Sequence, residues 1–287
     1  MVKGERFIRC VALQDRAGSH LHRRIGHERN SGRSRVSPVV GSASQGGTMA
    51  TDWCGRKFVS EIRPFLEACE VDLLIGHLRR YWPNKLLRDL LFCGDDETVK
   101  VALLCLSLTG TMEDTPGIAS LLPLADAFTR NLAEHALWSI WFRASDDRAN
   151  MALRRAVQLI GENRPNEALA RLSDLLDSHP GFAEAHNQRA ISYFLKGDYD
   201  SAKQDFSETL RLNPCHYAAL ACLGHCHARM AHLDTALALY RKAQRLHPHA
   251  EGLREAIEEV TQCLARSPFY GGSAPIVGDI PDLQPKP

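Results

Sequence analysis

One short segment of the sequence gathers cysteine and histidine, the residue types that bind zinc. Cys222, His225, Cys226 and His227 lie within six residues, with further cysteine and histidine at positions 215, 216 and 232. Thiolate and imidazole are ligands that zinc prefers. On a helix, however, His227 points about 100° away from the face shared by the other three, and no second pair of closely spaced cysteines is present. We therefore predict no metal site, and Cys222 and Cys226 are the first ligands to test if a metal binds.

The carboxylates that could act in catalysis stand where helix capping explains them. Asp95, Asp96, Asp146 and Asp147 precede predicted helices. At such positions a carboxylate accepts hydrogen bonds from free backbone N–H groups and lies near the positive end of the helix dipole. The sequence has no glycine-rich phosphate loop, no Gly-x-Ser-x-Gly turn and no His-Glu-x-x-His pair. We predict that the protein is not an enzyme and needs no cofactor.

The elements that would position any site recur with a fixed period. Residues 149–182, 183–216 and 217–250 are three consecutive blocks of 34 residues, each with a proline at its 32nd position. Spacings of three, four and seven place the apolar residues of each block on helical faces, and a polar turn divides each block into two helices. Small residues recur at the eighth and twentieth positions, and they are Ala156, Ala190, Gly224, Ala168, Ala202 and Ala236.

This pattern resembles the tetratricopeptide repeat, and it covers about a third of the chain. The second and third blocks match the family best, while the first has leucines where aromatic residues are usual. The resemblance implies a right-handed superhelix of helix pairs whose concave face binds a peptide or a helix of a partner protein. The partner-binding residues it implies are Asn150, Leu153, Val157, Glu184, Asn187, Ile191, Phe194, Leu195, His225 and Arg229.

The predicted groove is mostly apolar, with Leu153, Val157, Ile191 and Phe194 in a row. An exposed apolar patch of this kind normally marks an interface. Two occupants remain open: a peptide or amphipathic helix of another protein, or another part of this chain. Family members that bind a chaperone's terminal carboxylate use lysine, asparagine and arginine at defined repeat positions. We do not expect that ligand class, because these positions hold Leu153, Val157, Gln188, Ala218 and Cys222.

Two further helical regions flank the three blocks. Residues 53–148 contain two segments, 98–110 and 129–140, that match each other 31 residues apart and are similar to a HEAT-type repeat, with residues 121–128 as the first helix of the second unit. An irregular helical bundle is the alternative for this region. After the blocks, residues 251–266 are predicted to form a capping helix, because a repeat array needs one to cover its last apolar face. The predicted fold class is an all-α helical-repeat solenoid.

The two ends of the chain differ from the helical part in composition. Residues 1–48 hold eight arginines and one lysine against three acidic residues, a net charge of +6 in a chain whose total is +1. We predict a disordered tail over residues 1–52. Three interpretations remain open: an arm that binds nucleic acid or an acidic membrane, an organellar transit peptide, or a natural start at Met49. Residues 267–287, rich in glycine and proline, are predicted to be a second disordered tail.

Composition also limits where the protein acts. No stretch of about 18 uninterrupted apolar residues exists, so no transmembrane helix is expected. Nine cysteines without paired spacings favour free thiols in a reducing compartment, and we predict a cytoplasmic location. The sequence thus predicts a scaffold or adaptor that binds another protein. Its alternative is an adaptor brought to nucleic acid or acidic membrane by the basic arm, and the sequence does not name the partner.

Overall fold

The computed structural model describes residues 48–266. All secondary structure in this range is α-helix or 3-10 helix, and no strand occurs in it. The prediction of an all-α helical-repeat fold is confirmed at this level. The basic segment 1–47 and the tail 267–287 lie outside the described residues. The chain divides into two compact units.

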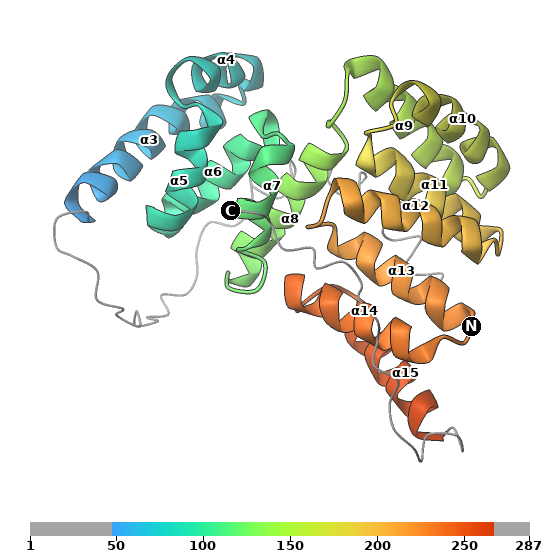
Figure 1. The fold of residues 1–287 in the computed structure, drawn as a ribbon. Coiled ribbons are helices and arrows are strands. Elements are labelled where there is room, and N and C mark those ends of the chain that lie inside the picture. The colour runs from blue at the N-terminus through green and yellow to red at the C-terminus, as the bar shows by residue number, and fades with distance from the viewer. Residues whose placement is uncertain (1–47, 267–287) are drawn as a thin grey trace. The chain divides into compact units, whose positions relative to one another are not determined.

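The first unit in chain order extends to Ile140, while residues 122–124 and the last residue of its final helix, Trp141, are grouped with the second unit. Its helices are α3 (Thr48–Ala68), α4 (Val71–Tyr81), α5 (Asn84–Cys93), α6 (Asp96–Thr109), η2 (Met112–Asp114), α7 (Thr115–Ala119) and α8 (Ala127–Trp141). Helix α3 packs against α4, α5 and α6, and α5 also packs against α6 and α7 (Figure 1). Phe58, Leu78, Leu87 and Leu103 are fully buried in this core. Helix α3 begins five residues before the boundary predicted at 53.

Two aspartates fix where helices of this unit begin. The Asp95 carboxylate accepts the Thr98 N–H at 2.8 Å and starts α6. The Asp126 carboxylate accepts from the Phe128 N–H at 2.9 Å and the Thr129 hydroxyl at 2.5 Å, so α8 begins at Ala127. The predicted helix over 121–128 is therefore wrong, because residues 121–125 are turns before this cap. The short helix of this stretch is α7, which has a proline in its first turn. The similarity to HEAT repeats stays a prediction.

The second unit contains the three 34-residue blocks, called repeats one, two and three from here on. Repeat one is α9 (Asp147–Gly161) and α10 (Pro165–Ser178), repeat two is α11 (Ala183–Leu195) and α12 (Tyr199–Leu212), and repeat three is α13 (Tyr217–Arg229) and α14 (Leu233–Leu246). Helix α15 (Leu253–Arg266) follows and packs against α14. Each helix packs against the next one along the chain (Figure 1). Leu253 and Val260 of α15 are buried, so this helix covers the end of repeat three.

Close approach of the two helices explains the small residues. A Cβ atom added to Gly224 would lie 2.6 Å from the ring of Tyr240, the residue at the twenty-fourth position of repeat three. Ala156 and Ala190, which hold the same position as Gly224 in the other repeats, are fully buried. The eighth position therefore has to be small because the facing side chain of the second helix occupies that space.

The second unit begins several residues before the predicted boundary at 149. Trp141 stacks on His216 with ring centroids 4.2 Å apart. The Asp146 carboxylate accepts the Ala149 N–H at 2.9 Å and caps α9, as predicted for this aspartate. All described cysteines are free thiols. Among the described helices, none is both long enough and apolar enough to cross a membrane.

Candidate partner-binding site

The ten predicted contact residues all lie on the first helices of the repeats, and most of them are buried. Helix α9 carries three, α11 five and α13 two. Eight of the ten are at most 8% exposed, Leu195 is half-buried and Arg229 is exposed. The apolar row is thus covered by the chain itself and is not an open patch. Burial of each such side chain stabilises the fold by about 1.5–3 kcal/mol. The buried members are Asn150, Leu153, Val157, Glu184, Asn187, Ile191, Phe194 and His225.

Glu184 is the centre of a buried polar cluster at the start of α11. One carboxylate oxygen accepts from the Asn187 amide at 3.0 Å and from the Gln188 amide at 2.7 Å. The other lies 2.9 Å from Nε2 of His216. The His216 Nδ1 accepts the Ala219 N–H at 3.1 Å, so Nε2 carries the proton and donates to Glu184. These donors replace the water that a buried carboxylate loses. The sequence singled out Glu184 and Asn187, but not His216, which comes from the end of the same repeat.

Asn150, a predicted contact residue, has a structural role in repeat one. Its side-chain amide donates to the Ser145 carbonyl at 2.9 Å, and its oxygen accepts the Ser145 N–H at 3.2 Å. Both groups of the amide are therefore used by the segment that enters α9. A partner would gain a contact with Asn150 only by replacing these two hydrogen bonds.

The cysteine and histidine segment in α13 is engaged in packing. The Tyr240 hydroxyl and His225 Nδ1 are 2.7 Å apart. Burial lowers the pKa of His225 to about 4, so this imidazole is neutral near pH 7. Burial also raises the pKa of the Cys222 and Cys226 thiols, which disfavours the thiolate that zinc requires. Among residues 48–266, no group of three or more histidine, cysteine or acidic residues is placed to hold a metal ion.

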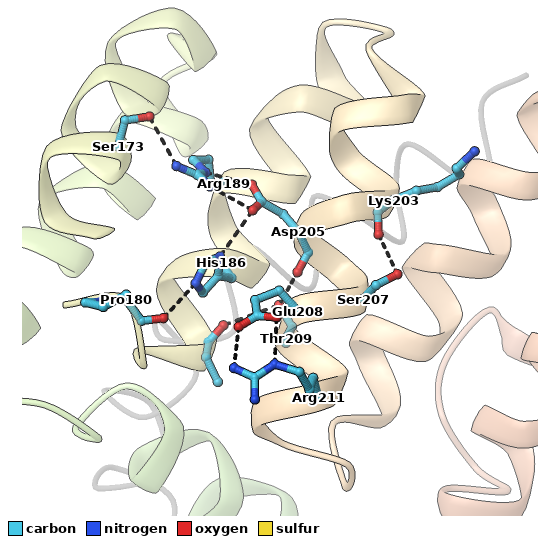
Figure 2. Close-up of polar contacts among 11 residues, drawn as sticks. Ser173, Pro180, His186, Arg189, Lys203, Asp205, Ser207, Glu208, Thr209 and Arg211 are labelled. Atoms are coloured by element: carbon cyan, nitrogen blue, oxygen red, sulfur yellow. Dashed lines mark hydrogen bonds and ion pairs between the residues drawn. The ribbon is translucent and has the colours of Figure 1, made fainter. Parts of the chain in front are cut away.

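A second polar cluster joins the two helices of repeat two on the other side of α11 (Figure 2). Arg189 donates to both carboxylate oxygens of Asp205, at 2.7 and 2.8 Å. His186 lies between two acceptors, with Nδ1 at 3.1 Å from the same carboxylate and Nε2 at 3.0 Å from the Pro180 carbonyl. Burial alone would raise the pKa of Asp205, but the hydrogen bonds from Arg189 and His186 outweigh it and lower the pKa. This cluster was not predicted from the sequence, although its arginine and aspartate stand at the seventh and twenty-third repeat positions.

The accessible part of the predicted site lies at the ends of α11 and α13. Arg229 is exposed, and its guanidinium lies over the Tyr199 ring at 5.4 Å from the ring centroid. Phe194 meets the same ring edge-on, with centroids 5.2 Å apart. Leu195 follows Phe194 and is half-buried. A partner that approaches the described structure therefore finds Leu195 and Arg229 first among the predicted residues.

Comparison with known proteins identifies the repeat. Residues 183–214, which are α11, α12 and the turn between them, match the tetratricopeptide repeat family model. Repeat two is thus a tetratricopeptide repeat, as the sequence pattern predicted. A curated relative, "Protein SGT1 homolog" from Bos taurus, is 33% identical over 86 residues. The match spans 30% of this chain and only a quarter of the length of that relative.

Solved tetratricopeptide repeat domains are similar to parts of the chain at low identity. The Sgt2 domain from Aspergillus fumigatus is 17% identical, covers 49% of this chain and 93% of its own, and has a TM-score of 0.42. The first such domain of Spaghetti (RPAP3), bound to the HSP90 peptide SRMEEVD, is 19% identical over 42% of this chain and 96% of its own, with a TM-score of 0.41. Both TM-scores are below 0.5.

Proposed function

We propose that the protein is a non-catalytic, cytoplasmic scaffold or adaptor that binds a peptide or helix of another protein at the concave face of its repeats. The observation that carries this proposal is the array α9–α14, whose first helices carry all ten contact residues that the resemblance implies. Five of these ten side chains are apolar and five are polar or charged. This composition suits an amphipathic helix or peptide, whose apolar residues provide the anchors.

A partner that binds this face has to displace the part of the chain that covers it. Leu153, Val157, Ile191 and Phe194 are at most 6% exposed, so their apolar surface is already removed from water. A partner that covers the same side chains gains affinity only from contacts that exceed those it replaces. We therefore expect binding to begin at Leu195 and Arg229, which are accessible, and to continue inward as the chain's own cover is displaced.

The acidic carboxyl terminus of a chaperone is not the ligand that this face fits. The RPAP3 domain is bound to the HSP90 peptide SRMEEVD, but the repeat positions that family members use to bind a terminal carboxylate hold apolar or uncharged residues in this chain. The Glu184 carboxylate, fully buried at the second position of repeat two, would also repel a ligand carboxylate brought near it. The proposed partner is therefore apolar at its contact residues and is not recognised through a terminal carboxylate.

The test is a capture experiment with the full chain as bait in a lysate of the organism that produces it. The variant Leu195→Asp with Arg229→Glu alters the accessible part of the face without touching the buried core. Gln204→Glu, on the exposed side of α12, is the matched control. Circular dichroism must show equal helicity for all three baits. We expect a protein retained by the wild type and the control but lost with the double variant. Equal retention by all three baits would contradict binding at this face.

A second candidate function rests on the charge of residues 1–48. Their net charge of +6 would attract nucleic acid or an acidic membrane surface, and this segment lies almost entirely outside the described residues. Binding through such charges weakens steeply as salt concentration rises, whereas binding through apolar contacts does not. Repeating the capture at low and high salt therefore separates the two candidates.

A further inference from the structure

The seventh and twenty-third positions of the repeats face each other across the two helices of a repeat. In repeat two these are Arg189 and Asp205, which form the two-point ion pair of Figure 2. In repeat three the same positions hold Leu223 and Leu239, which are 8% and 4% exposed. The two positions thus hold oppositely charged side chains in repeat two and two buried apolar side chains in repeat three.

Repeat one breaks this complementarity. Its seventh position is Arg155 on α9, and its twenty-third is Arg171 on α10, so a second arginine stands where repeat two has the aspartate. An open cavity of about 330 Å³ lies here, lined by both arginines. Within residues 48–266, the structure gives neither arginine a hydrogen bond to any side chain, and Arg171 has only the nearby charge of Glu167.

The carboxylates on the cavity wall are already occupied. Arg164 donates to Glu162 at 3.0 Å and to both oxygens of Glu167 at 2.6 and 2.7 Å. Glu162 also accepts from the Gln158 amide at 2.8 Å. One arginine thus satisfies two carboxylates, and the lining as a whole keeps a net positive charge from Arg155 and Arg171. The cavity offers two guanidinium groups and has no free carboxylate to meet them.

We propose that this cavity binds a carboxylate of an acidic peptide segment in the place that Asp205 fills in repeat two. A guanidinium is a planar donor that binds a carboxylate at two points, as Arg189 does within this chain. The site is separate from the concave face, because Arg155 lies two residues from Leu153 and from Val157, about 160° round the axis of α9. Both arginines are exposed, and a single exposed ion pair contributes little. The ligand is therefore a segment with several acidic residues, and its binding depends on salt.

The test follows the Nε–Hε NMR signals of Arg155 and Arg171 in the full chain during titration with blocked hexaglutamate at low salt. Arg241, an exposed arginine on α14, is the control, because the basic segment 1–48 will attract the same peptide without selectivity. We expect the signals of Arg155 and Arg171 to saturate at a peptide concentration at least tenfold below that which affects Arg241. Equal or unsaturable shifts of all three signals would overturn the proposal.

Two further experiments test whether the two arginines meet and whether their ligand is a carboxylate. In an Arg171→Asp variant, the introduced carboxylate should pair with Arg155 and abolish its response to the peptide. An unchanged response of Arg155 in this variant would show that positions seven and twenty-three do not meet in repeat one, against the proposal. Inorganic phosphate is the second probe: saturation of Arg155 by phosphate at a lower concentration than by hexaglutamate would replace the carboxylate assignment with a phosphate one.

Discussion

Repeats one and two have the same pair of helices, but the side chains between these helices differ in charge. Repeat two buries a charged cluster in which Asp205 is bound by Arg189 and His186. Repeat one has arginine at both corresponding positions and an open cavity instead. The repeat period places the same two positions between the helices, while the residue types at those positions decide whether an ion pair fills the space or a cavity stays open.

The largest expected effect is the loss of Asp205. An Asp205→Ala substitution leaves Arg189 and His186 without their shared acceptor, at side-chain exposures of 22% and 11%. Removing one partner of a buried ion pair costs about 3–5 kcal/mol, and we expect the lower end because Arg189 is partly solvated. Urea unfolding measures this loss. Arg171→Ala, at the same repeat position, is the control and should change stability by less than about 0.5 kcal/mol. Equal losses of unfolding free energy for the two variants would contradict the proposed difference between the repeats.

Repeat three should add a pH dependence that comes from a buried histidine, because it has His225 where the other repeats have Val157 and Ile191. The pKa of His225 is lowered from 6.5 to about 4 by burial. Between these values the unfolded chain binds a proton that the folded chain does not, so stability falls as pH decreases from about 6.5 to about 4. The loss is at most about 3 kcal/mol.

The measurement is urea unfolding at several pH values for the wild type and for His225→Gln, which keeps an acceptor for the Tyr240 hydroxyl but does not titrate. We expect a shallower decline in stability for the variant over this pH interval. Parallel curves for the two proteins would show that His225 does not supply the dependence.

The shared framework can be tested by overpacking. Ala190 is fully buried at the eighth position of repeat two, where Gly224 of repeat three has a ring within contact distance. Ala190→Leu should cost about 1–3 kcal/mol because the helix pair has no room for the added carbons. Ala170→Leu, at an exposed position of α10, is the matched control. A thermal melt of Ala190→Leu no lower than that of the wild type would contradict the register of the repeats.

The smallest expected effect comes from a substitution that gives repeat one the arginine and aspartate that repeat two has at its seventh and twenty-third positions. Arg171→Asp should create an ion pair with Arg155, worth about 0.2–1 kcal/mol at this exposure. A double-mutant cycle with Arg155→Gln isolates the interaction from changes in overall charge. A coupling energy of zero would mean that the two side chains do not reach each other.

The repeat framework could be predicted from the sequence, because a period of 34 residues with small and large residues at fixed positions reflects helix contacts that any such array must make. Asp95 and Asp146 were likewise predictable as helix caps, since that interaction is local. The start of α8 was not, because the apolar residues 121–128 suggested a helix while the cap formed by Asp126 decided its beginning.

The candidate site was predictable in position but not in environment. The helical period places Leu153 and Ile191 on the inner face, but only the folded chain shows that they are covered. The partners of Glu184 also escape sequence analysis, because His216 lies 32 residues away and reaches it only through the packing of successive repeats. A comparison of the seventh and twenty-third positions between repeats would have revealed Arg189 and Asp205.

The central claim, that the concave face of the repeats is where a partner binds, is tested most directly by site-specific photocrosslinking. A photoreactive amino acid replaces Leu195 in the full chain, and in a second sample it replaces Gln204 on the exposed side of α12. After irradiation in a lysate, we predict a crosslink from position 195 to a protein that position 204 does not reach. Crosslinks from position 195 that stay within the chain, with no partner attached, would contradict the claim and make this face part of the protein's own core.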